Sequence, residues 1–374
     1  MHRLASELVA GKVASAVAVG AAVGLARGWV QEFGAAGRLS YAPFEPGVTE
    51  NTWFDLASLT KPVTALASAR LARAGLVDLA TPLGALLPEL AGTPSASAPL
   101  ELLLAHRAGL EGHRPLFRNA MHGKIGSRAE MLREAAAARR PDAAGAIPPE
   151  GFLPVYSDLG YLLVGEAIAR AGGKPLDWLV EELVFAPLEL TMGSARRIRA
   201  KDAGFEKAVA ATEWVAWRAG TVRGLVHDEN AWSYSGEAAS GHAGLFGTVG
   251  AVLTLGRAVV DVLRDRNRSF LTREELWPLV KPRPLGTLRA GFDGKSDAGS
   301  SSGAKFGKST IGHLGFTGTS LWCDVDRQMV GVLLTNRVHP TRENEGIRRA
   351  RPYAYDRMAD WAAARIGRAD SSSL

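Results

Sequence analysis

The chain has 374 residues, of which 47% are hydrophobic and 22% are charged, so it can form one large globular domain or two closely packed ones. The net charge is +6, but the basic residues are scattered along the chain, which argues against a nucleic-acid-binding protein. Cys323 is the only cysteine, which excludes an intrachain disulfide and a cysteine-based metal site.

The N-terminal region is predicted to form a short helix followed by a hairpin. Residues 1–12 have an amphipathic helical pattern, and residues 13–26 and 28–35 are strand-like runs rich in valine and alanine. Residues 8–26 are similar to a secretion signal, but Glu7 precedes this stretch, Lys12 interrupts it and a second strand follows. We therefore expect a cytoplasmic protein without a membrane partner.

The middle of the chain is predicted to be mainly helical. Residues 76–245 contain helical patterns separated by proline and glycine. Thr248 is predicted to cap a further helix that has a single apolar stripe. Residues 291–310 are rich in glycine, serine and lysine, which predicts a flexible loop.

The C-terminal region adds two strand-like runs, 313–324 and 329–335, and a closing helix from Tyr353 to Arg365. Strands thus lie at both ends of the chain and helices in its middle. We expect one sheet domain formed by residues 1–75 and 246–374, with the helical middle inserted into it. The active site should lie at the interface of the two parts.

A candidate nucleophile and base lie three residues apart, at Ser58 and Lys61, where a helical pattern begins. A serine hydroxyl needs a nearby base, and lysine can serve once burial and neighbouring positive charge lower its pKa. A helix N-terminus also supplies N–H groups that stabilise an oxyanion. The alternative is that Ser58 caps a helix and that Lys61 is solvated.

Other short motifs in the chain lack the structural context that their chemistry requires. Ser302 and Lys305 have the same spacing, but no helical pattern follows them. Residues 299–303 match the nucleophile elbow around Ser301 without the preceding strand, and 303–309 only approach a phosphate-binding loop. The eight histidines show no metal-binding spacing, so we expect neither a metal nor another cofactor.

Two further segments supply groups that Ser58 and Lys61 lack. Tyr156 lies on a turn before an apolar helix, where its phenol could share proton transfer with a lysine. Residues 315–322 are predicted to be a strand whose glycines allow close approach of a substrate, with the Thr319 N–H completing an oxyanion hole. The alternatives are a half-buried turn tyrosine and a bulged edge strand.

These motifs follow one another in a recognisable order: Ser58-x-x-Lys61, His106-Arg-Ala-Gly-Leu110, Tyr156-x-Asp158 and Phe316-Thr317-Gly318. In this order they resemble the serine β-lactamase and penicillin-binding protein superfamily, specifically the branch of class C β-lactamases, D-alanyl-D-alanine carboxypeptidases and family VIII esterases. Three other stretches resemble β-lactamase-related serine hydrolases, namely Val226–Ala231, Gly241–Phe246 and Leu333–Asn344.

The resemblance implies an α/β (α+β) sandwich that has an antiparallel sheet flanked by helices and an inserted helical domain. It also implies acyl transfer through an acyl-serine: Ser58 attacks, Lys61 and Tyr156 move protons, and the N–H groups of Ser58 and Thr319 hold the oxyanion. The residues expected to contact substrate are Asp158, His313, Phe316, Thr317 and Gly318.

Two departures from the family pattern bear on the substrate. Asp158 stands where the tyrosine motif usually ends in asparagine, and its carboxylate should change the charge that Lys61 experiences. Phe316 stands where lactamases and peptidases usually have a lysine that binds a substrate carboxylate. We therefore expect anionic substrates to bind more weakly than neutral ones.

Three functional hypotheses follow from these motifs. The first is a serine hydrolase of small esters or amides. The second is a β-lactamase or D-amino-acid carboxypeptidase, which would need a cation from His313, Arg337 or Arg342. The third is a non-catalytic binding or sensing protein with the same fold. The expected partner is a small molecule, and the oligomeric state stays open.

Overall fold

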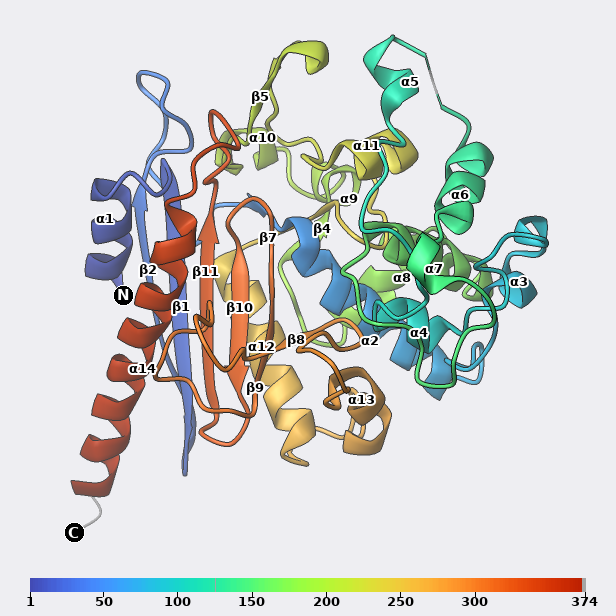
Figure 1. Ribbon diagram of the computed structural model, residues 1–374. Coiled ribbons are helices and arrows are strands. Elements are labelled where there is room, and N and C mark those ends of the chain that lie inside the picture. The colour runs from blue at the N-terminus through green and yellow to red at the C-terminus, as the bar shows by residue number, and fades with distance from the viewer. Residues whose placement is uncertain (125, 372–374) are drawn as a thin grey trace.

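The computed structural model describes residues 1–124 and 126–371 and contains a six-stranded sheet (Figure 1). Neighbouring strands are antiparallel in the order β2-β1-β11-β10-β9-β8. The strands are β1 (Ala16–Leu25), β2 (Gly28–Gly37), β8 (Asp293–Gly294), β9 (Thr310–Leu314), β10 (Ser320–Asp324) and β11 (Met329–Thr335). Because β1 pairs with β11, the sheet is built from both ends of the chain, as the sequence predicts.

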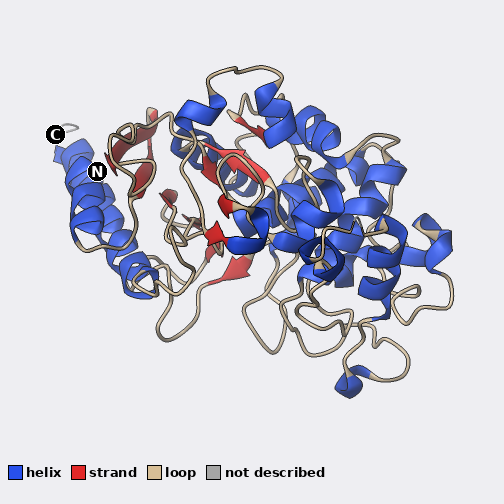
Figure 2. Cartoon of the chain, turned by 90° about the horizontal axis from the view of Figure 1, so that it is seen from above, coloured by secondary structure: helices blue, strands red, loops and turns tan. Residues whose placement is uncertain are grey.

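Helices cover both faces of this sheet (Figures 1 and 2). Alternate residues of a strand point to opposite faces. On β1, Val19 packs with α1 (His2–Ala10) and α14 (Ile347–Ser371), whereas Ala18 packs in the core that includes α12 (Val249–Leu263). The small residues of β1 on the α12 side let that helix approach the sheet closely.

The beginning of α12 agrees with its sequence signal. Thr248 is the N-cap, and its side chain accepts a hydrogen bond from the Ala251 N–H. The predicted apolar stripe is buried, including Val252, Leu253 and Val259. The predicted cap and core face of this helix are therefore confirmed.

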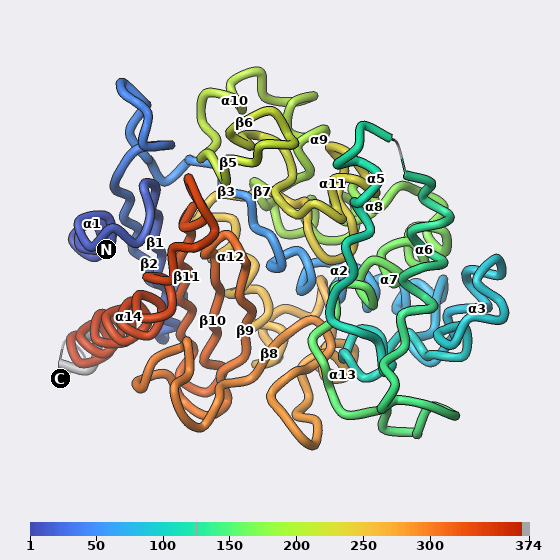
Figure 3. The backbone as a smooth tube through the Cα atoms, turned by 45° about the horizontal axis from the view of Figure 1, so that its top comes forward, coloured from blue at the N-terminus to red at the C-terminus, as the bar shows by residue number. Residues whose placement is uncertain are grey.

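The helical part of the molecule is packed around α2 (Thr60–Arg73), in which eleven of fourteen residues are buried. This helix contacts α7 (Asp158–Ala171), α8 (Leu176–Val180) and α13 (Arg273–Val280). Both α1 and α14 lie on the far side of the sheet from this part (Figure 3). Because α2 is central, residues in its first turn lie in the interior of the protein.

The remaining elements are short. The helices are α3 (Leu83–Leu86), α4 (Leu100–Leu104), α5 (Arg118–Met121), α6 (Arg128–Ala137), α9 (Ala195–Arg199), α10 (Phe205–Ala208) and α11 (Glu229–Ser235). The 3₁₀ segments are η1 (Ala57–Leu59), η2 (Pro88–Leu90), η3 (Pro141–Ala143) and η5 (Ala216–Arg218), and η4 (Glu181–Phe185) is a π-helix. One small sheet contains, in this order, β3 (Phe54–Asp55), β7 (Leu245–Gly247) and β4 (Met192–Ser194). Another contains β5 (Trp214–Val215) and β6 (Gly220–Thr221).

One sequence prediction about the C-terminal region is wrong. Residues 313–324 do not form one strand, because β9 ends at Leu314 and a tight turn leads into β10. Gly318 has a φ of +100° in this turn, a conformation that glycine adopts without strain. Residues 291–310 form a loop apart from β8 and the first residue of β9, as the sequence predicts, but this loop is packed in part, because Ser302 is fully buried and the backbone at Gly303 lies against Asp356 of α14.

The length and apolar character of the helices also bear on membrane insertion. Within residues 1–124 and 126–371, no helix is both long enough and apolar enough to cross a bilayer.

Candidate active site

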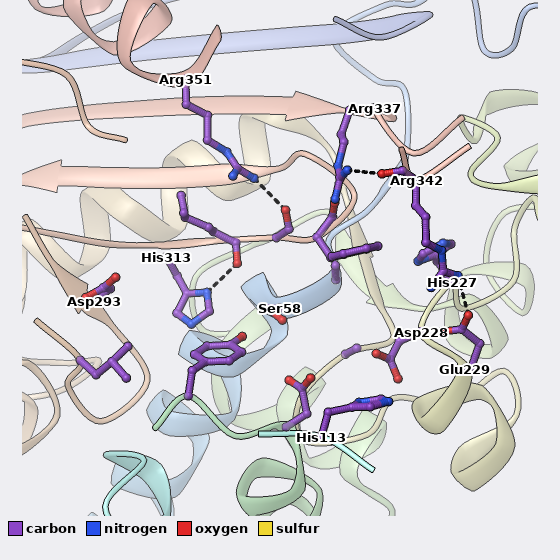
Figure 4. A pocket seen from close by; sticks show the side chains of 18 of the residues that line it. Ser58, His113, His227, Asp228, Glu229, Asp293, His313, Arg337, Arg342 and Arg351 are labelled. Atoms are coloured by element: carbon purple, nitrogen blue, oxygen red, sulfur yellow. Dashed lines mark hydrogen bonds and ion pairs between the residues drawn. The ribbon is translucent and has the colours of Figure 1, made fainter. Parts of the chain in front are cut away.

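Ser58 lies at the start of the central helix and borders a cavity of about 630 Å³ (Figure 4). It belongs to η1, which leads directly into α2. The preceding residue, Ala57, has a φ of 47°, which is unusual for a residue with a side chain. The buried Asp55 carboxylate holds this bend by accepting hydrogen bonds from the N–H groups of Ala57 and His227, both at 2.8 Å.

Lys61 lies one turn beyond Ser58, and its side chain is fully buried. Its Nζ donates to Ser58 Oγ at 2.9 Å, to Asp158 Oδ1 at 2.6 Å and to the His242 carbonyl at 3.3 Å. Three acceptors match the three protons of an ammonium group. Lys61 is therefore not solvated, and the alternative interpretation of this residue is wrong.

The pKa of Lys61 is set by two opposing effects. Burial lowers the pKa of Lys61, but the carboxylate of Asp158 and the phenol of Tyr156 raise it more, so that the net pKa lies above its ordinary value. The sequence analysis expected burial and neighbouring positive charge to lower the pKa of Lys61, and in the structure its pKa is raised instead. Asp158, the departure from the family pattern, is the main reason.

Tyr156 lies on the cavity wall, directly before Ser157, the N-cap of α7. Its ring stacks on His106 at 4.7 Å, and Lys61 Nζ lies 4.7 Å from the ring centre. Burial raises the pKa of Tyr156, and Lys61 and Ser58, which both interact with its phenol, offset this only in part. His106 Nδ1 accepts a hydrogen bond from the Ser157 N–H at 2.9 Å, which fixes this turn.

The end of β9 and the first residues of the following turn form the opposite wall. Its cavity-lining residues are His313, Leu314, Gly315 and Phe316. The expected substrate contacts at Thr317 and Gly318, and the expected oxyanion donor Thr319, do not line the cavity. Both threonines are almost fully buried, and their hydroxyls are bonded to backbone carbonyls behind the wall.

His313 does line the cavity, but it does not supply a cation. Its Nδ1 lies 2.9 Å from the Leu314 carbonyl, so Nδ1 carries the proton and donates. Burial, followed by the nearby charge of Lys61, lowers the pKa of His313 to about 3. The imidazole is therefore neutral near pH 7.

The arginines on the cavity wall differ in their partners (Figure 4). Arg342 is paired with Glu213 and Glu229. In contrast, Arg337 and Arg351 donate only to backbone carbonyls within the described part of the chain, and neither forms an ion pair there. Sequence reasoning did not identify Arg351, which lies outside every motif considered.

Phe316 is 49% exposed and lies among charged groups. The Arg337 and Arg342 guanidinium groups lie 4.5 and 5.7 Å from its ring centre, and the His227 ring stacks on it at 5.8 Å. The residue has no charge itself, but two cations flank it. The cavity therefore contains positive charge, although the lysine that the family usually has at position 316 is absent.

A second pair of polar residues, Asp228 and His242, also lies at this site. The sequence motifs did not predict a role for either residue, although Asp228 lies in the stretch Val226–Ala231 and His242 in the stretch Gly241–Phe246. His242 Nε2 lies 3.0 Å from Asp228 Oδ1, and its carbonyl accepts from Lys61. The stretches 226–231 and 241–246 thus meet at the active site. Only the fold shows this, because neither stretch has a recognisable spacing of its own.

The false motifs lie elsewhere in the molecule. Ser302 is bonded to Ser300, and Lys305 pairs with Asp360 of α14. Neither Ser302 nor Lys305 borders the cavity that contains Ser58.

Together, the antiparallel sheet, the central helix and the Ser58–Lys61–Tyr156 cluster define the β-lactamase fold class. The family model described as Beta-lactamase matches residues 5–355. The chain therefore belongs to the β-lactamase family, a family of hydrolases.

Curated proteins and solved structures are similar to this chain over most of its length. The chain is 29% identical over 313 residues to an N-acetylmuramyl-L-alanine amidase of Bacillus subtilis, covering 77% of this chain and 68% of the relative. SurE, solved with D-Leu, has a TM-score of 0.68 at 22% identity and covers 96% of this chain and 74% of its own. EstCE1, a hydrolase with promiscuous acyltransferase activity, has a TM-score of 0.69 at 18% identity, covering 94% and 97%. These two structural likenesses concern the fold.

Proposed function

We propose that this protein is a serine hydrolase that forms an acyl intermediate on Ser58 and acts on small esters or amides. The observation that carries this proposal is the contact between Ser58 Oγ and the buried Lys61 Nζ at 2.9 Å, with Tyr156 beside both and a cavity in front. A nucleophile, a proton carrier and space for a substrate are thus in one place.

Proton transfer starts from a protonated Lys61. In the resting site the ammonium donates to Ser58 Oγ, so Lys61 must lose one proton before it can accept that of Ser58. The neutral amine then takes the serine proton as Oγ attacks the carbonyl carbon. Tyr156 donates a proton to the leaving group and regains one from Lys61, which becomes a neutral amine again. In the second step Lys61 takes a proton from water through Tyr156 as the water attacks the acyl carbon, and it returns a proton to Ser58 Oγ as the acid is released.

We assign the role of holding the oxyanion to two backbone N–H groups. Ser58 lies at a helix start, where N–H groups have no partner in the helix. Phe316 borders the cavity, and no acceptor within residues 1–124 and 126–371 is bonded to its N–H. We therefore assign the second donor to Phe316 instead of Thr319.

A second candidate function is supported by Arg337 and Arg351. Two guanidinium groups without carboxylate partners border the cavity, and they would suit a substrate with a carboxylate. A β-lactam or a peptide ending in a D-amino acid has such a group. A curated relative of Escherichia coli, 27% identical over 318 residues, is named a putative D-alanyl-D-alanine carboxypeptidase, and this name is compatible with the second candidate.

Two comparisons of substrates decide between the two candidates. For the ester hydrolase we expect kcat/KM for p-nitrophenyl butyrate to exceed that for nitrocefin, and we expect Ser58→Ala to abolish both activities. The sharper pair is N-acetyl-D-alanyl-D-alanine and its C-terminal carboxamide. A charge-assisted contact is worth roughly 1.5 to 3 kcal/mol, or about ten- to a hundredfold, so a preference of this size for the free acid would establish the second candidate instead.

A further inference from the structure

The two proposed oxyanion donors come from distant parts of the chain. Ser58 follows β3, whereas Phe316 lies in the turn between β9 and β10. An oxyanion hole works only when its donors lie about 2.7 to 3.1 Å from the place where charge develops. The relative position of residues 55–58 and 315–319 must therefore be fixed.

Two buried hydroxyls connect these segments directly. Thr317 Oγ1 donates to the Asp55 carbonyl at 2.8 Å, and Thr319 Oγ1 donates to the Leu56 carbonyl at 3.0 Å. Both threonines are at most 1% exposed and neither borders the cavity. The carbonyls that they bind lie two to three residues before Ser58.

The turn also lies against this segment with little free space. A Cβ atom at Gly315 would lie 2.0 Å from Thr319 Oγ1 and 2.7 Å from the Leu56 carbonyl. On its other side, Arg351 Nη2 donates to the Gly315 and Thr319 carbonyls at 2.7 and 3.0 Å. The turn is therefore held from both sides, and the two threonines provide the link toward Ser58.

We propose that Thr317 and Thr319 are positioning residues that set the separation of the Ser58 and Phe316 N–H groups. This inference rests on the proposed serine hydrolase function. It replaces the substrate-binding and oxyanion roles that the motifs suggested for these threonines. They act through hydroxyl groups behind the cavity wall and touch no substrate.

The test removes the hydroxyls and preserves the shape of the side chains. In Thr317→Val/Thr319→Val we expect kcat for p-nitrophenyl butyrate to fall about ten- to a hundredfold, with KM little changed. Thr317→Ser/Thr319→Ser keeps both hydroxyls and should retain most of the activity. Thr212→Val is the matched control, because Thr212 is buried and donates to the Val222 carbonyl at 2.9 Å away from the cavity.

A second readout separates positioning from general damage. Sulfur accepts hydrogen bonds weakly, so a thionoester gains little from an oxyanion hole. The ratio of p-nitrophenyl butyrate to p-nitrophenyl thionobutyrate turnover should therefore fall in the valine variant and stay unchanged in Thr212→Val. If the double variant does not fold, Thr317→Val and Thr317→Ser are compared instead.

Three results would overturn the inference: an unchanged kcat, an equal loss for ester and thionoester, or serine variants as impaired as the valine variants. The native protein is assayed first with Ser58→Ala beside it. Absence of Ser58-dependent hydrolysis would overturn the proposed function and this inference together. Normal native hydrolysis with unaffected valine variants would overturn the inference alone.

Discussion

Asp158 is the residue that most changes how this site must work. Its carboxylate lies 2.6 Å from Lys61 Nζ, and Lys61 is completely buried. An asparagine at this position would accept the same hydrogen bond without adding a charge. The carboxylate therefore favours the ammonium form of Lys61, which is the form that cannot act as a base.

The first prediction concerns the pH dependence of Asp158→Asn. Burial lowers the pKa of Lys61, and Asp158 is the strongest of the groups that raise it. Without this carboxylate the pKa should fall, the neutral amine should form at lower pH, and the ascending limb of kcat/KM should move down by about one to three pH units. The measurement is a pH profile with p-nitrophenyl butyrate, corrected for uncatalysed hydrolysis.

Asp293→Asn is the control for this profile, because Asp293 also borders the cavity but makes no contact with Lys61. Its ascending limb should stay in place. If the limb of Asp158→Asn does not move, or moves to higher pH, Lys61 is not the group whose deprotonation limits the rate.

At the scale of elements, local patterns predicted the secondary structure well where the chain is regular. The predicted strand 329–335 coincides with β11, and the cap and stripe of α12 are present. The turn at 315–319 interrupts the predicted strand 313–324, in which the glycines were expected to allow close approach of a substrate. The hydrogen bond from the Gly315 N–H to the Thr319 carbonyl shows instead that Gly315 and Gly318 belong to a turn, where glycine is typical.

The prediction at this scale concerns the cap of α12. Thr248→Ala removes the acceptor for the Ala251 N–H and should lower the free energy of unfolding by about 0.5 to 2 kcal/mol. Urea unfolding measures this change. Thr254→Ala, inside the same helix, should be neutral or slightly stabilising because alanine has the higher helix propensity. Equal losses in the two variants would contradict the capping role.

At the scale of the whole molecule, the site lies where distant segments meet. Ser58 and Lys61 come from the central helix region, Tyr156 from the turn before α7, and Phe316 from the turn between β9 and β10. The order of motifs was sufficient to select the first three residues and the family. It could not show Arg351, which reaches the cavity from α14, because only the folded sheet brings that helix close.

The measurement that tests the central claim most directly is intact mass after reaction with a fluorophosphonate. We expect the native protein to gain one adduct, located on Ser58 by peptide mapping. Ser301→Ala and Ser302→Ala should gain the same adduct, and Ser58→Ala should gain none. An adduct that persists in Ser58→Ala would show that another residue is the nucleophile. A native protein that gains no adduct would contradict the hydrolase and favour a non-catalytic binding protein with this fold.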